Sequence, residues 1–133
     1  MKAAKSITFI QMDNDRRACL AYLVGLVMKQ ERLGSFLYDH TDLKYRYFRS
    51  FEHIANRYVK VFDERRACFM EGYLPLLFDY GSSSFININI TQKSFFAFDN
   101  ATNYHLFGCC SHNIIQILDS QTKKRYYYTL SIL

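Results

Sequence analysis

The chain has 133 residues, half of them apolar and 17% aromatic, with five glycines and a single proline. This length suits one compact domain or a tight pair of sub-domains, and the composition excludes a disordered or linker-rich chain. The net charge of +5 lies in the first half: residues 1–66 carry 13 Lys/Arg against 8 Asp/Glu, whereas residues 67–133 carry four of each. The excess favours an acidic partner for the first half, whether a protein, a phosphate or a nucleic acid.

The apolar stretches of the sequence are short. The richest, residues 19–28, falls below the roughly 18 residues needed to span a bilayer. A polar segment at residues 11–17 stands where a signal peptide would have its apolar region. The four cysteines show no spacing typical of a disulfide framework. These features predict a protein of the cytoplasm or nucleus.

The N-terminal part contains one alternating segment and one ambiguous segment. Residues 6–13 alternate apolar and polar side chains, and Asn14-Asp15 follows, a pair favoured in turns. Residues 17–24 fit a return strand that would complete a hairpin. They also fit the start of a helix, because apolar residues continue at helical spacing as far as Met28.

The clearest predicted helix covers residues 41–62, with Thr41 or Asp42 as its N-cap. Apolar side chains recur there every three or four positions, as in an amphipathic helix. They are Leu43, Tyr47, Phe51, Ile54, Tyr58 and Val61. A basic set that includes Arg46, Arg49 and Arg57 would lie on the opposite surface, as is typical of a solvated helix face.

From Tyr73 onward the apolar period changes to two, which predicts six short strands joined by polar turns. The predicted strands cover residues 73–80, 85–90, 95–98, 104–110, 114–118 and 125–132. Connections this short require antiparallel neighbours, so the strands form a meander. Its buried face would hold Ile86, Ile88, Leu106, Ile115 and Ile117. Because one apolar sheet face needs a cover, the predicted fold is α+β: a six-stranded antiparallel meander packed against the long amphipathic helix.

Several motifs in this order resemble the polo box of polo-like kinases, a six-stranded meander with a helix packed across it. Tyr73-Leu74 is similar to the opening of a second polo box, and the Tyr-rich residues 125–131 are similar to its last strand. Residues 6–15 resemble the late hairpin of a first polo box, and residues 43–50 the helix that connects two boxes. The resemblance implies an N-terminal hairpin or helix over residues 1–40, a connecting helix over 41–66, and a polo-box-like meander over 67–133.

The resemblance also implies a function. Polo boxes of this kind are non-catalytic protein–protein interaction modules that recruit a kinase or its partner to a centriole or kinetochore, and any kinase activity would lie outside this chain. The family reads phosphate with an Asp-His-Thr-Lys motif, where this chain has Asn100-Ala101-Thr102-Asn103. Ala101 and Asn103 cannot make charge-assisted hydrogen bonds to phosphate, so the phosphopeptide pincer is predicted to be lost. The candidate partner-binding residues are Arg46, Arg49, Arg57, Thr102, Asn103 and Tyr104.

Self-association is a further expectation. Residues 6–24 supply at most two strands, and a two-stranded ribbon is only marginally stable in water. An unpaired strand edge invites pairing with a second copy, and similar box modules dimerise, so a homodimer is predicted. If residues 18–33 are instead helical, they would pack on the predicted helix and leave a closed monomer.

The sequence carries no motif that predicts catalysis, a cofactor or a metal. Asp39-His40 and Glu52-His53 are sequence neighbours, which do not face each other on a helix. Four possible zinc ligands, His105, Cys109, Cys110 and His112, lie within eight residues. Adjacent cysteines on a strand point to opposite faces, however, and this disfavours a shared ion. The chain is therefore predicted not to be an enzyme.

Binding of single-stranded nucleic acid is the alternative function. Sheets that show aromatic side chains beside basic ones stack bases on the rings. The candidates are Tyr126, Tyr127 and Tyr128 after Lys123, Lys124 and Arg125, with Phe95, Phe96 and Phe98 nearby in sequence. Against this alternative, the charge excess lies in the half predicted to be helical.

Overall fold

The computed structural model describes residues 11–50 and 57–133, and its first element is helix α1 (Asn14–Lys29). Asp13 caps the helix, since its side chain accepts a hydrogen bond from the Arg16 backbone N–H at 2.7 Å. Every residue of α1 from Arg16 to Leu26 is buried. Residues 17–24, which in the sequence fit either a strand or a helix, are therefore part of a helix. Because this helix is enclosed on all sides, its sequence lacks the solvent-facing polar stripe of an amphipathic surface helix.

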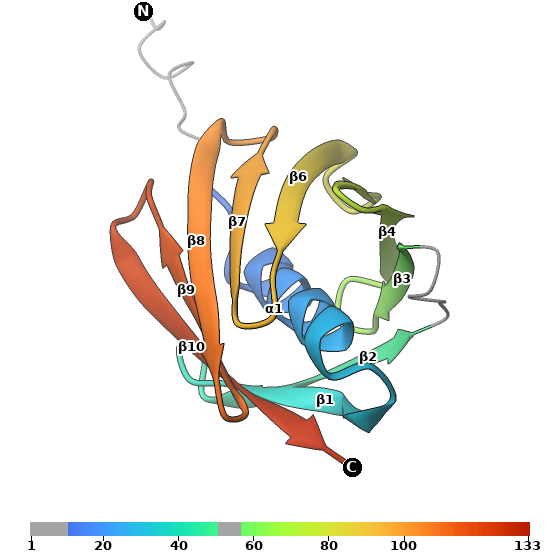
Figure 1. Cartoon of the computed structure of the whole chain (residues 1–133). Helices are drawn as coiled ribbons and strands as arrows, with labels where there is room; N and C mark the ends of the chain where they lie inside the picture. The colour runs from blue at the N-terminus through green and yellow to red at the C-terminus, as the bar shows by residue number, and fades with distance from the viewer. Residues whose placement is uncertain (1–10, 51–56) are drawn as a thin grey trace, which may run out of the picture.

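After the short 3-10 helix η2 (Gln30–Arg32), ten strands follow in chain order. They are β1 (Leu33–Asp39), β2 (Lys44–Ser50), β3 (Tyr58–Asp63), β4 (Cys68–Tyr73), β5 (Leu76–Asp79), β6 (Ser84–Ile90), β7 (Ser94–Asp99), β8 (Tyr104–Ser111), β9 (Ile114–Asp119) and β10 (Lys124–Ile132). Each strand pairs antiparallel with its neighbours in sequence, and β1 pairs with both β2 and β10. The sheet therefore closes into a barrel (Figure 1).

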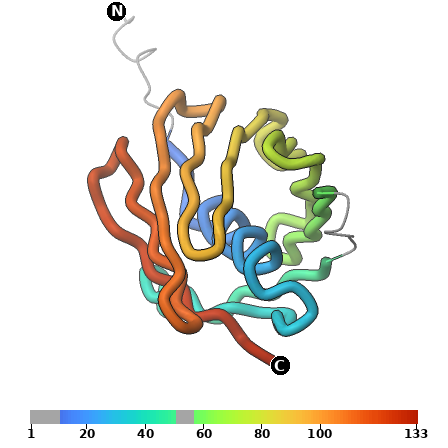
Figure 2. The backbone as a smooth tube through the Cα atoms, viewed as in Figure 1, coloured from blue at the N-terminus to red at the C-terminus, as the bar shows by residue number. Residues whose placement is uncertain are grey.

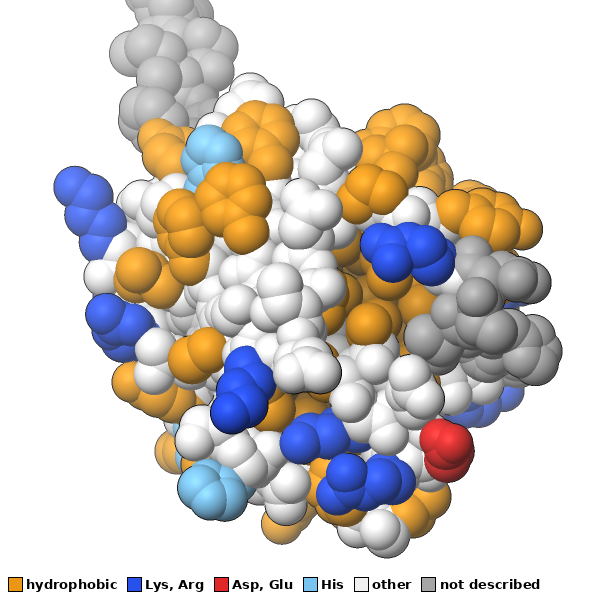
Figure 3. Space-filling model, viewed as in Figure 1, with side chains coloured by type: hydrophobic (Ala, Val, Ile, Leu, Met, Phe, Trp, Pro, Cys, Tyr) orange, Lys and Arg blue, Asp and Glu red, His pale blue; other side chains and the backbone are white. Residues whose placement is uncertain are grey.

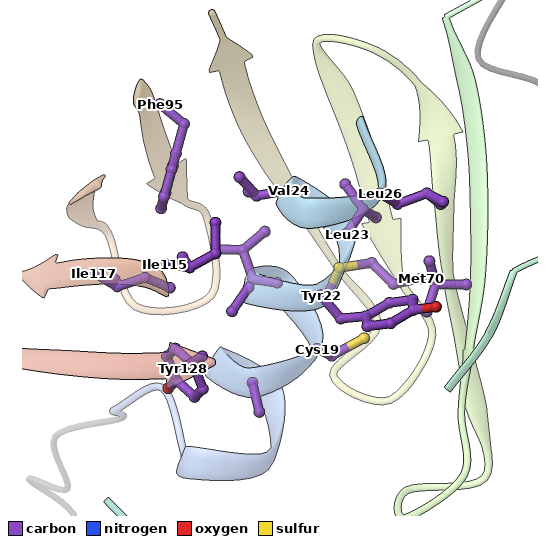
Figure 4. Packing of buried hydrophobic residues seen from close by; sticks show 14 of the residues in the cluster. Cys19, Tyr22, Leu23, Val24, Leu26, Met70, Phe95, Ile115, Ile117 and Tyr128 are labelled. Atoms are coloured by element: carbon purple, nitrogen blue, oxygen red, sulfur yellow. The ribbon is translucent and has the colours of Figure 1, made fainter. Parts of the chain in front are cut away.

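Helix α1 lies inside the barrel, as the tube in Figure 2 shows. A barrel of ten strands is wider than the eight-stranded barrels whose interior side chains alone can fill, and here the helix occupies the extra space. In Figure 4 side chains of α1 fill the region between Met70 of β4 and Ile115 of β9. The helix approaches β10 closely at Gly25, where an added Cβ would lie 2.9 Å from Leu130 Cδ2.

The predicted fold, a six-stranded meander packed against a long helix, is wrong. The described residues assigned to that helix form β2, β3 and turn positions 41–43 and 57, whereas residues 51–56, with Phe51 and Ile54, lie outside the described part. The inward positions of β2 include Arg46, while Tyr47 and Arg49 point outward. In β2 a polar residue points inward and aromatic residues point outward, so the alternation of apolar and polar side chains that marks a strand is concealed. The helical spacing of the apolar residues therefore appears stronger than the strand pattern.

The strands predicted in the second half are present as β5 to β10, in antiparallel order. The five residues predicted for the buried face, Ile86, Ile88, Leu106, Ile115 and Ile117, are each at most 1% exposed, which confirms that prediction. What covers this face is α1 together with the four further strands, all in the same barrel.

Closure of the barrel also removes the argument for an open edge. Among the described strands each one pairs with a neighbour on both sides, and β1 and β10 seal the seam. The prediction of a homodimer rested partly on an unpaired strand edge, and that reason does not apply to this barrel.

Candidate functional site

One type of turn closes five hairpins at the same end of the barrel. The strands β1, β3, β5, β7 and β9 each end in an aspartate whose carboxylate accepts a hydrogen bond from the backbone N–H two residues on. These are Asp39, Asp63, Asp79, Asp99 and Asp119, and all are at most 2% exposed. Four residues after each aspartate the backbone has a positive φ, at Leu43, Ala67, Ser83, Asn103 and Lys123. We call the five buried aspartates the carboxylate ring.

Two arginines of α1 neutralise the carboxylate ring from inside. Arg16 donates to Asp79 Oδ2 at 2.7 Å and makes two hydrogen bonds with the carboxylate of Asp99, at 2.7 and 2.8 Å. Arg17 donates to Asp119 Oδ2 at 3.1 Å. The positive end of the helix dipole adds to this attraction, because both arginines belong to the first turn of α1.

Two further arginines complete the pairing. Arg46 Nε lies 2.8 Å from Asp39 Oδ2, and Arg66 contacts Asp63 at 2.7 Å and Asp79 at 3.0 Å. Burial alone would raise the pKa of Asp79, but hydrogen bonds and charges from Arg66 and Arg16 hold that pKa below its ordinary value. Each of the five carboxylates thus has an arginine partner, as buried charges require, and the network fastens this end of the barrel.

Because α1 occupies the barrel interior, the outer surface is the broad surface open to a ligand, apart from pockets such as the one of about 480 Å³ that Tyr22, Leu33 and Phe48 help to line. Five neighbouring strands, β5 to β9, present an outward surface that we call the uncharged face. Strand alternation and pairing place these side chains on it: Leu76, Phe78, Phe85, Asn87, Asn89, Ser94, Phe96, Phe98, His105, Phe107, Cys109, Ser111, Ile114, Gln116 and Leu118. None of these described residues is Lys, Arg, Asp or Glu.

Aromatic rings form the centre of the uncharged face. Phe96 and Phe107 are 43% and 41% exposed, and their ring centroids lie 5.1 Å apart. The His105 ring stacks on Phe96 with 5.1 Å between the ring centroids, and its centroid lies 4.9 Å from that of Phe98. Figure 3 shows hydrophobic side chains gathered over the upper part of β7 and β8, while Lys and Arg side chains lie below and to the sides. Aromatic side chains without charges are typical of the cores of protein interfaces.

The six predicted partner-binding residues do not lie on one surface. Arg46 is 3% exposed and belongs to the carboxylate ring network. Arg49 points outward on β2, 3.3 Å from Glu64, and Arg57 precedes β3. Thr102, Asn103 and Tyr104 belong to the turn between β7 and β8 and to the start of β8, which stand across the barrel from β2.

The residues considered for metal binding or catalysis do not converge. Within residues 11–50 and 57–133 no group of three or more His, Cys, Asp or Glu side chains could hold a metal ion. Cys109 is on the outer side of β8 and Cys110 on the inner side, as neighbours on a strand must be. His40 Nε2 lies 2.7 Å from Thr129 Oγ1, and His53 lies outside the described residues.

The tyrosines proposed to stack nucleic-acid bases lie on two sides of the barrel wall. Tyr126 and Tyr128 point inward and are buried, whereas Tyr127 points outward. Phe95 is buried as well, and Phe96 lies on the uncharged face, away from cations. These residues therefore form no common aromatic and basic surface.

The carboxylate ring was missed although the sequence contains a signal for it. An apolar residue followed by aspartate ends each odd-numbered strand, at Tyr38-Asp39, Phe62-Asp63, Phe78-Asp79, Phe98-Asp99 and Leu118-Asp119. Successive aspartates are 24, 16, 20 and 20 residues apart. A period near the length of one hairpin predicts five hairpins, and so ten strands.

Comparisons of the chain with protein-family models, with curated proteins and with solved structures gave no match. The resemblance to a polo box, and the kinase and cell-division roles that it implies, stay predictions. In the described part of the chain, no helix is both long enough and apolar enough to cross a membrane.

Proposed function

We propose that this chain is a non-catalytic binding module that docks a protein partner on the uncharged face. The observation that carries this proposal is the run of five adjacent strands whose outward side chains include no Lys, Arg, Asp or Glu. The rest of the described outer surface does carry charges, such as Lys60 and Glu71 on β3 and β4. A contiguous uncharged patch with exposed aromatic rings favours an interaction site.

The chemistry of the face defines the kind of partner. A phosphate or an acidic segment would find no cation on it, so those ligands are disfavoured. An apolar protein surface would cover Phe96 and Phe107 without leaving a charge buried and unpaired. Asn87 and Asn89, both exposed, add side-chain amides that can hydrogen-bond to partner backbone, although the Asn87 Oδ1 also accepts from Asn100 at 2.9 Å.

The sequence suggests which protein could be the partner. A kinase, or a kinase partner at a centriole or kinetochore, is the partner that the polo-box resemblance implies. A second copy of the chain is another protein that fits an uncharged face, because two chains of net charge +5 repel each other least where neither carries charge.

A photo-cross-linking experiment tests the proposal. The cross-linking amino acid p-benzoylphenylalanine replaces Phe96 or Phe107 in the full chain, expressed in cells with an affinity tag. The matched control places the same group at Tyr47, an exposed aromatic position on β2 outside the face. Discrete protein adducts at positions 96 and 107 that are missing at position 47 are the expected result.

Two outcomes have clear meanings. An adduct with twice the mass of the chain would identify the partner as a second copy. If positions 96 and 107 yield the same adducts as position 47, or none after irradiation, the uncharged face is not a docking surface and the proposal fails.

A further inference from the structure

A second surface of the barrel combines rings with cations. On the outward sides of β2, β3 and β4, the guanidinium of Arg49 lies 4.5 Å from the ring centroid of Phe62. The ammonium group of Lys60 lies 4.6 Å from the ring centroid of Phe69, and the two rings lie 5.0 Å apart. We call the outward side of these three strands the cation–aromatic surface.

Tyrosines extend this surface in both directions. Tyr45 and Tyr47 of β2 are 56% and 53% exposed. At the other end the rings of Tyr58 and Tyr73 lie 4.9 Å apart, and Tyr73 is 67% exposed. A pocket of about 280 Å³ opens beside the first pair and is lined by Lys44, Tyr45, Arg46, Tyr47, Glu64 and Arg65.

The charge of this surface is positive. Among the described residues, five cationic side chains lie on or beside the three strands, namely Lys44, Arg49, Arg57, Lys60 and Arg65, against the acidic side chains of Glu64 and Glu71. The two carboxylates are engaged locally: Glu64 lies 3.3 Å from Arg49, and Glu71 accepts a hydrogen bond from the Tyr58 hydroxyl. Arg65 also lies 3.6 Å from Asp15. A positive excess remains beside the exposed rings.

From these contacts we infer that the cation–aromatic surface binds single-stranded nucleic acid. Bases of any sequence can stack on the exposed tyrosine rings, and the cations beside those rings neutralise the phosphates that link the bases. Only unpaired bases have faces free to stack on side-chain rings, so the single strand is the form that fits. An acidic peptide would use the cations but not the rings, and it is therefore the less suitable ligand.

In the sequence, the location of the charge excess in a predicted helix argued against nucleic-acid binding by a sheet, and the observed strands remove this objection. The charge excess of the first half was assigned to a helix, apart from any sheet. Residues 44–50 and 58–63 are strands, so Arg49 and Lys60 lie on the sheet surface beside the rings. This inference uses strands that do not belong to the uncharged face, and it holds or fails independently of the proposed function.

Fluorescence anisotropy with labelled dT12, rU12 and a labelled twelve-residue poly-glutamate tests the inference. Wild-type chain is expected to bind both oligonucleotides and to bind poly-glutamate at least about tenfold more weakly. Between about 50 and 300 mM salt, the logarithm of the association constant should fall with a slope near −2, as for about three phosphates neutralised on a single strand.

Variants separate charge from stacking. The double variant Arg49→Ala/Lys60→Ala is expected to reduce the salt slope, and Tyr47→Leu is expected to weaken binding about tenfold at unchanged slope. The control Lys123→Ala/Lys124→Ala removes one cation from the turn before β10 and one from the first position of β10, both outside this surface, and should change affinity less than about twofold. Circular dichroism melting verifies that each variant is folded, and Tyr47→Phe should restore binding.

Three results would overturn the inference. One is no oligonucleotide binding by the wild type at about 50 mM salt. Another is equal loss of affinity in the control and in the Arg49→Ala/Lys60→Ala variant, which would show unspecific attraction to a basic chain. The third is equally tight binding of poly-glutamate, which would identify the surface as a site for acidic peptides.

Discussion

At the scale of single residues, the arrangement of charge inside the barrel is the main finding. Asp79 is fully buried, and its carboxylate binds Arg16 at 2.7 Å, Arg66 at 3.0 Å and the Ser82 hydroxyl at 2.8 Å. The removal of one partner of a buried ion pair leaves the other partner uncompensated, and this is more costly than the loss of a surface pair.

This pairing predicts how stability depends on pH. The pKa of Asp79 is lower in the folded chain than its ordinary value of 3.8. Its contribution to stability is therefore complete above that value and is lost as the pH falls toward the lower pKa of the folded state. Urea unfolding measured between about pH 7 and pH 2 should show the free energy of unfolding falling in the acid range.

The variant Asp79→Asn should lose about 3 kcal/mol at neutral pH and should show a shallower decline in acid. The control Ser82→Ala keeps the carboxylate and its arginine partners. It should lose only about 1 kcal/mol, for one hydrogen bond, and should keep the steep decline. Equal pH dependence in wild type and Asp79→Asn would contradict the pairing scheme.

At the scale of elements, the five hairpins repeat one local solution. The aspartate that ends an odd-numbered strand accepts a backbone hydrogen bond, and the fourth residue after it takes a left-handed conformation. Asn103 suits such a conformation, because its short polar side chain bonds locally, whereas Leu43 does not. Leu43 is also 72% exposed, so little packing compensates its strain.

Leu43→Gly should therefore stabilise the chain by about 0.5–1 kcal/mol, the balance between relieved strain and the larger entropy of unfolded glycine. Leu43→Ala is the control, because it removes the exposed side chain and retains the Cβ that causes the strain. Thermal or urea unfolding of both variants provides the measurement. A glycine variant less stable than the alanine variant would contradict the strained turn.

Element by element, the sequence predicts local structure better than its assembly. Alternation in residues 85–90 identified a strand and its buried face, because isoleucines at every second position leave no helical alternative. Alternation failed in β2, where inward Arg46 is paired with Asp15 of α1, Asp39 of β1 and Asp42 of the β1–β2 turn. Asp15 lies 31 residues from Arg46, and no local pattern reports such a partner.

The uncharged face and the cation–aromatic surface could likewise be predicted only in part, because each depends on contacts between strands. The uncharged face is visible in the sequence as residues 67–133 with few charges, although its width of five strands depends on the register of the barrel. The cation–aromatic surface was hidden because two of its three strands, β2 and β3, were assigned to one helix. The approach of Arg49 to Phe62 across β2 and β3 is a long-range contact that spacing alone cannot show.

At the scale of the whole molecule, the enclosure of α1 couples it to every strand that surrounds it. Its residues 16–26 are all buried, and the ladder between β1 and β10 closes the wall. Water can therefore reach the backbone of the helix only when the wall opens, and this links the exposure of α1 to global unfolding.

Native-state hydrogen exchange should show this coupling. Amides of residues 17–26 are expected to exchange with a free energy equal to that of urea unfolding, whereas amides in the exposed turn after β6, residues 91–94, should exchange with a smaller value. Mass spectrometry of peptides from both regions is the measurement. Faster exchange in α1 than in the turn would contradict an enclosed helix.

The position of the enclosed helix in the chain has a consequence for biosynthesis. Helix α1 precedes all ten strands of the described residues, and the contacts of β1 with β10 join residues as far apart as Leu33 and Ile132. During translation the apolar helix leaves the ribosome about 100 residues ahead of the strand that seals the wall, which is several seconds at common elongation rates. Until β10 is made, the closed wall that buries the helix in the folded chain cannot form, so apolar side chains of α1 stay partly exposed during synthesis.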